Sequence, residues 1–140
     1  MYDGNELYAR LIECGYEVEE IESTAQEGML GYYYAERRDT GDSIYYMYFE
    51  DTKAARAMYD YVKSSYKAEV AELELEIEKV EYALYKSEDV SAAKKGKYYE
   101  KYVELTEELE ELKNITHGQS FNIVWYGTKQ AVDDIKGKSE

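Results

Sequence analysis

Two stripes of apolar residues run through the middle of the chain, between Thr52 and Lys113, at alternating spacings of three and four. This spacing is typical of helices that pack in pairs. A short polar segment, Lys86–Asp89, separates the stripes, so the pattern predicts an antiparallel coiled-coil hairpin with its turn there. The first stripe is Tyr66, Val70, Leu73, Ile77, Val80 and Leu84, and the second is Tyr98, Tyr102, Leu105, Leu109 and Leu112.

The first of these helices begins after Asp51 or Thr52, either of which can cap it. Its early apolar residues are expected to pack on a sheet, and these are Ala55, Met58, Tyr59 and Val62. A helix of this length measures roughly 50 Å at about 1.5 Å per residue, which is more than a small body can cover. We therefore expect a single domain, residues 1–140, with a body formed by 1–63 and 115–140 and a projecting hairpin formed by 64–114.

Shorter patterns predict the elements of the body. The expected elements are a helix from about Asn5 to Cys14 that ends at Gly15, a strand over 16–21, a hairpin of strands 29–37 and 43–50 around the turn 39–42, a linker over 114–120, a strand over 120–126, and a helix from Thr128 to Gly137 with Ala131, Val132 and Ile135 inward.

The segments around Thr52 and Thr128 resemble each other, since each follows an aromatic strand and reads Thr-Lys-x-Ala before a helix. Two such units favour an α+β fold of the ferredoxin-like type, a two-layer sandwich with a small, mostly antiparallel sheet. The coiled-coil hairpin would then be inserted between the two units.

Charge narrows the classes of function. The chain has 17 basic and 31 acidic side chains and a formal net charge of −14. Direct binding to nucleic acid or to an anionic membrane requires a basic patch, so the charge argues against both. It favours a basic protein as the partner.

Compartment signals are few. Cys14 is the single cysteine, so no intramolecular disulfide can form, and its apolar surroundings indicate a buried, inert thiol. No apolar run has the length of a membrane span, and the first residues lack the pattern of a signal peptide. We therefore expect a cytoplasmic protein.

Acidic residues are concentrated on the hairpin. In the predicted pairing, residues 70–78 lie beside residues 104–111, and the lysines gather nearer the turn. Like charges at these positions cost stability, which favours a binding surface that imitates phosphates, although a solvated helix face is the simpler interpretation. The eleven glutamates are Glu69, Glu72, Glu74, Glu76, Glu78 and Glu81 on the first helix and Glu104, Glu107, Glu108, Glu110 and Glu111 on the second.

Tyrosine is the other unusual feature, with 18 residues in the chain. Tyrosine is common at the centres of binding surfaces. We therefore predict a partner-binding patch on the two strands of the 29–50 hairpin. Cross-strand packing within the sheet is the alternative explanation. The predicted patch residues are Tyr32, Tyr34, Tyr46 and Tyr48.

Catalytic patterns are missing from the sequence. His117 is the single histidine, expected in an exposed loop, and no serine or cysteine is placed to act with it. There is no glycine-rich phosphate loop and no cysteine–histidine set for zinc. We therefore expect no catalytic residues, no cofactor and no metal. Abundant carboxylates leave one enzymatic hypothesis, in which paired acids act in a cleft.

The leading hypothesis is a non-enzymatic acidic protein that inhibits a basic, nucleic-acid-binding partner such as a nuclease or effector, by mimicking nucleic acid. No motif identifies a family, but the composition resembles that of small phage-encoded inhibitors of restriction and CRISPR nucleases. The alternative hypothesis is a structural or adaptor module that self-associates, for example as a homodimer, through its hairpin or its tyrosine-rich sheet.

Overall fold

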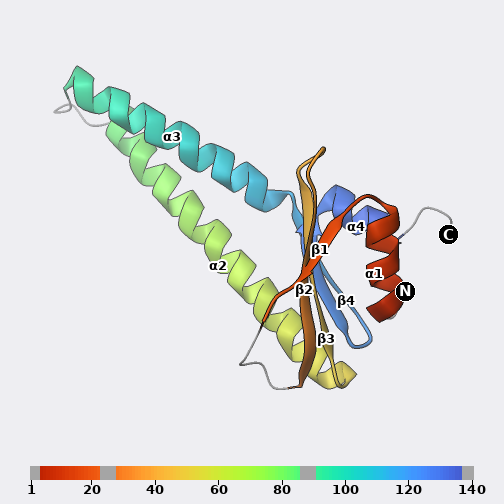
Figure 1. Cartoon of the computed structure of the whole chain (residues 1–140). Coiled ribbons are helices and arrows are strands. Elements are labelled where there is room, and N and C mark those ends of the chain that lie inside the picture. Colours follow the sequence, from red (N-terminus) through yellow and green to blue (C-terminus); the bar gives the residue numbers. More distant parts are fainter. Residues whose placement is uncertain (1–3, 23–27, 86–90, 137–140) are drawn as a thin grey trace. The chain divides into compact units, whose positions relative to one another are not determined.

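The computed structural model describes residues 4–22, 28–85 and 91–136 of the chain (Figure 1). These residues form four helices and five strands. In chain order they are α1 (Gly4–Glu13), β1 (Glu17–Glu20), β2 (Met29–Arg37), β3 (Asp42–Phe49), α2 (Thr52–Tyr85), α3 (Ala92–Lys113), β4 (Ile115–Ser120), β5 (Ile123–Thr128) and α4 (Lys129–Lys136).

The chain divides into two compact units. One contains Met1–Lys63 together with Asn114–Glu140, and the other contains Ser64–Lys113. The boundary falls within α2, whose first turns belong to the first unit. Within the residues that the structure describes, no helix is both long and apolar enough to cross a membrane.

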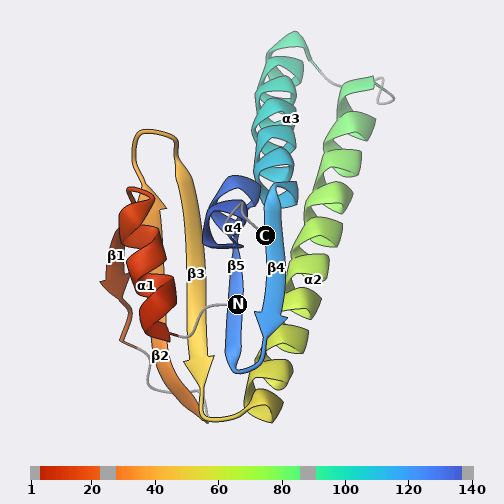
Figure 2. The same cartoon turned by 90° about the vertical axis from the view of Figure 1, so that its right-hand side faces the viewer.

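The first unit is built on one antiparallel sheet with the order β1-β2-β3-β5-β4, which Figure 2 shows from the side of α1 and α4. Every neighbouring pair is antiparallel. The expected α+β class with an antiparallel sheet is therefore confirmed.

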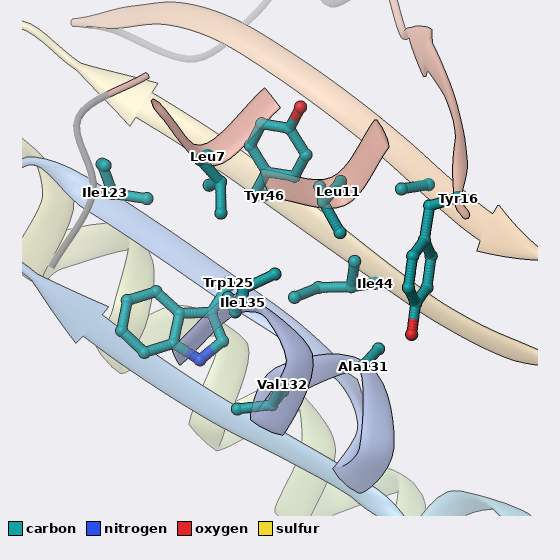
Figure 3. Close-up of a cluster of buried hydrophobic side chains, with 11 residues drawn as sticks. Leu7, Leu11, Tyr16, Ile44, Tyr46, Ile123, Trp125, Ala131, Val132 and Ile135 are labelled. Carbon is teal, nitrogen blue, oxygen red and sulfur yellow. The ribbon is translucent and has the colours of Figure 1, made fainter. Parts of the chain in front are cut away.

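One face of the sheet packs against α1 and α4 (Figure 1). Leu7 and Leu11 from α1 and Ile135 from α4 are fully buried there. They meet Ile44 and Tyr46 of β3 and Trp125 of β5 (Figure 3). Alternate residues of the central strands thus supply most of this core, as the pleat of a strand requires.

The first turns of α2 cover the other face. Ala55 is fully buried, and it packs with Met47, Phe49 and Val124 of the sheet. Met58, Tyr59 and Val62 join the same cluster, as predicted. Since helices lie against both faces, the finer prediction of a ferredoxin-like, two-layer sandwich is not confirmed.

Capping residues account for the helix boundaries. Asp51 Oδ1 accepts a hydrogen bond from the Ala54 amide at 2.8 Å, and Thr128 Oγ1 accepts one from the Ala131 amide at 3.4 Å. Gly15 follows α1 with φ 93°, a left-handed conformation in which glycine carries little strain. These boundary predictions are confirmed, while the predicted end of the last helix at Gly137 lies outside the described residues.

One predicted linker is wrong. Residues 115–120 form strand β4 rather than a loop, and His117 lies within that strand and is half-buried. The segment Ile-Thr-His-Gly-Gln-Ser has no alternating apolar pattern, so its extended conformation depends on pairing with β5. Its glycine suits that position, because the ring of Trp125 fills the space where a Cβ of Gly118 would lie.

The start of β5 also differs from the prediction. Ser120 pairs with Ile123, so Phe121 and Asn122 form a two-residue hairpin loop instead of the first part of the strand. Phe121 has φ 53° and is 75% exposed. Two-residue hairpin loops require positive φ at such a position, and here the loop geometry outweighs the apolar alternation that Phe121 continues in the sequence.

In the second unit, burial follows the two predicted stripes. Every stripe residue of α2 and α3 is buried or half-buried, and Leu84 and Leu105 are the most buried. Lys113 Nζ lies 3.8 Å from Glu74 Oε2. The end of α3 therefore lies beside the middle of residues 64–85, the part of α2 that belongs to the second unit. The predicted turn at Lys86–Asp89 lies outside the described residues.

Candidate functional site

The glutamates of the second unit form the first candidate surface, called here the acidic surface. Ten of the eleven predicted glutamates are exposed, and Glu76 is half-buried. They are exposed because the apolar stripes occupy the inward positions of both helices, which leaves the charged positions outside.

Part of the acidic surface is brought together across the two helices. Glu69, Glu72 and Glu76 of α2 line one hollow of about 290 Å³ with Glu108 of α3. Lys101 is the basic residue in the lining. This grouping agrees with the predicted register, in which residues near 70–78 lie beside residues near 104–111.

The ion pair between Lys113 and Glu74 offsets little of this charge. Both side chains are more than half exposed, at 56% and 55%. Exposed pairs of this kind contribute about 0–1 kcal/mol. Most carboxylates of the acidic surface therefore face solvent beside other carboxylates, which raises the local negative potential.

The second candidate surface is a row of rings that crosses four strands of the sheet. Tyr34, Tyr45, Tyr126 and His117 are successive cross-strand partners on β2, β3, β5 and β4. The ring centroids are 4.7 Å apart for Tyr34–Tyr45, 5.0 Å for Tyr45–Tyr126 and 6.0 Å for His117–Tyr126. All four side chains of this aromatic row are half-buried.

Tyr32 extends the row along β2. Its hydroxyl group lies 3.1 Å from that of Tyr126, within hydrogen-bond distance, and its ring centroid is 6.1 Å from that of Tyr45. Burial raises the pKa of Tyr45, and the nearby Tyr34 and Tyr32 raise it further. Tyr45 is therefore uncharged at neutral pH.

His117 ends the row on the outer strand. Burial lowers the pKa of its imidazole, and the positive charge of Lys63 lowers it further. His117 is therefore neutral at pH 7 and adds no positive charge to the sheet.

The four predicted patch tyrosines do not share one surface. Tyr32 and Tyr34 lie on the face that carries the aromatic row, whereas Tyr46 and Tyr48 lie on the face covered by α1 and α4. Tyr46 is fully buried, so its assignment as a partner contact is wrong. Consecutive tyrosines alternate between faces, and only the tertiary structure shows which face each helix covers.

Three members of the row, Tyr45, Tyr126 and His117, were missed by the sequence-based prediction. The sequence contained one signal for Tyr45. Tyr45 lies two and four residues before the apolar Met47 and Phe49, so the three side chains point to the same face of β3. His117 had no such signal, because β4 itself was not predicted.

Acidic side chains are abundant in the part of the chain that the structure describes. No group of three or more histidine, cysteine, aspartate or glutamate side chains there could hold a metal ion. A hollow of about 670 Å³ beside the start of α2 contains Glu50, Asp51 and Lys53. Oδ1 of Asp51 accepts the capping hydrogen bond from the Ala54 amide.

Comparisons with known proteins add no assignment: neither a protein-family model, nor a curated protein, nor a solved structure matches this chain.

Proposed function

We propose that this protein is a non-enzymatic inhibitor that binds a basic, nucleic-acid-binding protein through its acidic surface, in the manner of an anti-restriction or anti-CRISPR nucleic-acid mimic. The observation that carries the proposal is the exposure of ten glutamates on two consecutive helices. The proposal includes an antiparallel coiled-coil pairing of residues 64–113, which would hold these carboxylates in fixed positions.

Charge density supports the mimicry. Six glutamates lie between Glu69 and Glu81, a length of about 18 Å at about 1.5 Å per residue. These glutamates lie on more than one side of the helix, and their mean axial spacing is about 3.6 Å, close to the ~3.4 Å between phosphates along one DNA strand. A groove that has evolved to bind phosphates would attract such a surface and align with it.

The absence of compensation also favours a binding role. Glu72 has Glu69 three residues before it and Glu76 four residues after it, and such like-charge pairs destabilise a helix by about 0.2–0.5 kcal/mol each. Replacing some of these glutamates by lysine would relieve the repulsion. Glutamates at such repulsive positions are expected where a partner supplies the opposite charge.

The experiment is capture of native proteins on the immobilised protein, followed by elution in steps of rising salt. The expected captured proteins are basic and bind nucleic acid, they elute between about 50 and 200 mM salt, and duplex DNA competes with their binding. Charge reversal at four positions, Glu74→Lys, Glu76→Lys, Glu108→Lys and Glu110→Lys, should abolish capture.

A matched variant controls for net charge. Glu20, Glu22, Asp60 and Asp133 are exposed acidic residues of the first unit, and their reversal changes the total charge by the same amount. This control should retain capture. Capture that survives reversal of the acidic surface, or that DNA does not compete, contradicts the proposal.

Self-association is the second candidate function, favoured by large apolar side chains exposed on the helices of the second unit. Leu75 is 51% exposed, Tyr82 62% and Tyr99 56%. A homodimer through this unit predicts a sedimentation coefficient that rises with protein concentration. A strictly monomeric species over a hundredfold range of concentration would eliminate it.

A further inference from the structure

The outward side of α2 carries a second heptad row, separate from the stripe that faces inward. Leu75 lies two residues from both Leu73 and Ile77 of the inward stripe, which places it about 160–200° away around the helix. The row continues in steps of three and four in both directions, interrupted by Glu78. Its other members are Ser64, Ala68, Ala71, Tyr82 and Tyr85.

Exposure separates this outward row from the inward one. Leu75, Tyr82 and Tyr85 are 51%, 62% and 69% exposed, and the small residues of the row are exposed as well. Three exposed large side chains at heptad positions are the pattern with which a helix packs against another helix. The small residues Ala68 and Ala71 allow the backbone of such a helix to approach closely.

Charged residues flank the outward row and define what can cover it. Glu72, Glu74 and Glu81 lie beside the row, and Glu78 lies within it. Two basic residues, Lys67 and Lys79, also lie beside the row, so acidic residues are in excess. A second copy of this chain would bring one acidic row against another, which costs stability. A helix with lysine or arginine beside its own apolar row would instead pair with these carboxylates.

Tyr82 and Tyr85 provide anchoring positions near the end of the row. Together with Glu78, Lys79 and Glu81 they line a hollow of about 430 Å³. Aromatic rings next to carboxylates suit the long side chains of lysine and arginine, because the ring face attracts the cation and packs on the methylene groups.

We propose that the outward row of α2 is a docking site for a basic amphipathic helix of the partner protein. This inference rests on the proposed function, and it specifies the secondary structure that the partner presents. The apolar face of the partner helix covers Leu75, Tyr82 and Tyr85, and its basic residues pair with the flanking glutamates. Charge then steers the encounter, while the apolar row provides selectivity for a helix.

The test uses the full chain and three synthetic peptides, of which the first is a basic amphipathic helix of about three heptads with leucine at the core positions and lysine beside them. The second has the same composition in scrambled order, and the third is polylysine of equal charge. Isothermal titration at moderate salt should show the amphipathic peptide binding at least about tenfold more tightly than the scrambled one. Hydrogen exchange should show protection within α2.

Two matched variants localise the contact. Leu75→Ser with Tyr82→Ser removes apolar area without changing charge and should weaken the amphipathic peptide about tenfold or more, while polylysine, which loses only one exposed cation–π contact, should weaken by at most about fivefold. Val103→Ser with Tyr99→Ser changes exposed residues of the same kind on α3 and should leave both affinities unchanged. Circular dichroism confirms that each variant keeps its helices.

Each outcome has a distinct meaning. Equal affinity for the amphipathic and scrambled peptides overturns the inference but leaves the proposed function intact, because charge alone then suffices. Failure of every basic peptide, including polylysine, overturns both. Concentration-dependent dimerisation that the α2 variant abolishes also overturns the inference, since a second copy would then be the occupant of the row.

Discussion

The hydroxyl group of Tyr16 donates a hydrogen bond of 2.7 Å to Oδ2 of Asp134, which joins the start of the sheet to the last helix. The other carboxylate oxygen of Asp134 accepts a hydrogen bond from Gln130 Nε2. The backbone carbonyl of Asp134 accepts a hydrogen bond of 2.8 Å from Arg10 Nε. Hydrogen bonds between residues far apart in the sequence thus connect the elements on the face of the sheet that α1 and α4 cover.

Replacement of Tyr16 by phenylalanine tests this link. Tyr16→Phe should lower the free energy of unfolding by about 1–2 kcal/mol, because a hydrogen bond to a charged group is lost while the ring stays buried. Urea denaturation at pH 7 measures the change. Tyr61→Phe is the control, since Tyr61 is 66% exposed and its change should have no measurable effect.

Alkaline pH should reveal the contribution of the Tyr16 hydroxyl group to the free energy of unfolding. Burial raises the pKa of Tyr16 above its ordinary value, and the hydrogen bond to Asp134 raises it further. Because the pKa of Tyr16 is higher in the folded than in the unfolded state, the protonated hydroxyl group stabilises the fold. This contribution is complete below about pH 10, where the unfolded tyrosine still holds its proton, and it is lost as the pH rises further. Wild type should therefore lose more stability between pH 9 and pH 11 than Tyr16→Phe does, and equal losses would contradict this assignment.

Acidic pH should lower the free energy of unfolding through protonation of His117. Its folded pKa is lowered by burial and then by Lys63, so the folded state resists protonation. Its contribution to stability is complete above about pH 6.5 and is lost as the pH falls through the lower folded pKa. His117→Gln should reduce the loss of stability between pH 7.5 and pH 5, and an imidazole pKa above about 6.5 by NMR would refute the prediction.

Two glycines should respond in opposite directions to alanine. At Gly118 a new Cβ would meet the ring of Trp125, whereas at Gly96 in α3 it would enter open space. Gly118→Ala should therefore cost about 1–3 kcal/mol through displaced packing, and Gly96→Ala should add about 0.5–1 kcal/mol by favouring the helix. Thermal denaturation of the pair measures both, and destabilisation of similar size at the two sites would show that the Trp125 contact is not the cause.

The inward and outward rows of the second unit should differ in their tolerance of truncation. Leu105 is 4% exposed and Leu75 is 51% exposed. Leu105→Ala should cost about 2–4 kcal/mol, whereas Leu75→Ala should change stability by less than about 0.5 kcal/mol. Loss of helical ellipticity on heating reports both, and equal effects would show that the two rows are not distinguished by burial.

Relief of repulsion should stabilise the protein while it weakens binding. Glu72→Lys replaces two like-charge pairs on α2 by attractive ones, so it should raise the free energy of unfolding by about 0.8–2 kcal/mol at low salt. The gain should shrink in 1 M salt, where charges are screened beyond about 3 Å. A gain that persists in high salt would have to come from helix propensity instead.

The features that the sequence predicted correctly are those set by local periodicity. Heptad spacing located the inward residues of α2 and α3, because the face of a helix follows from its period alone. Capping by Asp51 and Thr128, and the left-handed glycine after α1, were also predictable, since they depend on neighbours within a few residues. The acidic surface followed from the same pattern, because residues outside an apolar stripe are exposed.

Other features depended on contacts between distant segments. The strand character of residues 115–120 comes from pairing with β5, and the burial of Tyr46 comes from the helices α1 and α4. The aromatic row of Tyr34, Tyr45, Tyr126 and His117 exists only because four strands align in one register. Local sequence determined which residues form helices and which face of each is apolar, while the tertiary structure decided which tyrosines are covered and which rings meet, because strand register and layer order are set by packing across the whole first unit.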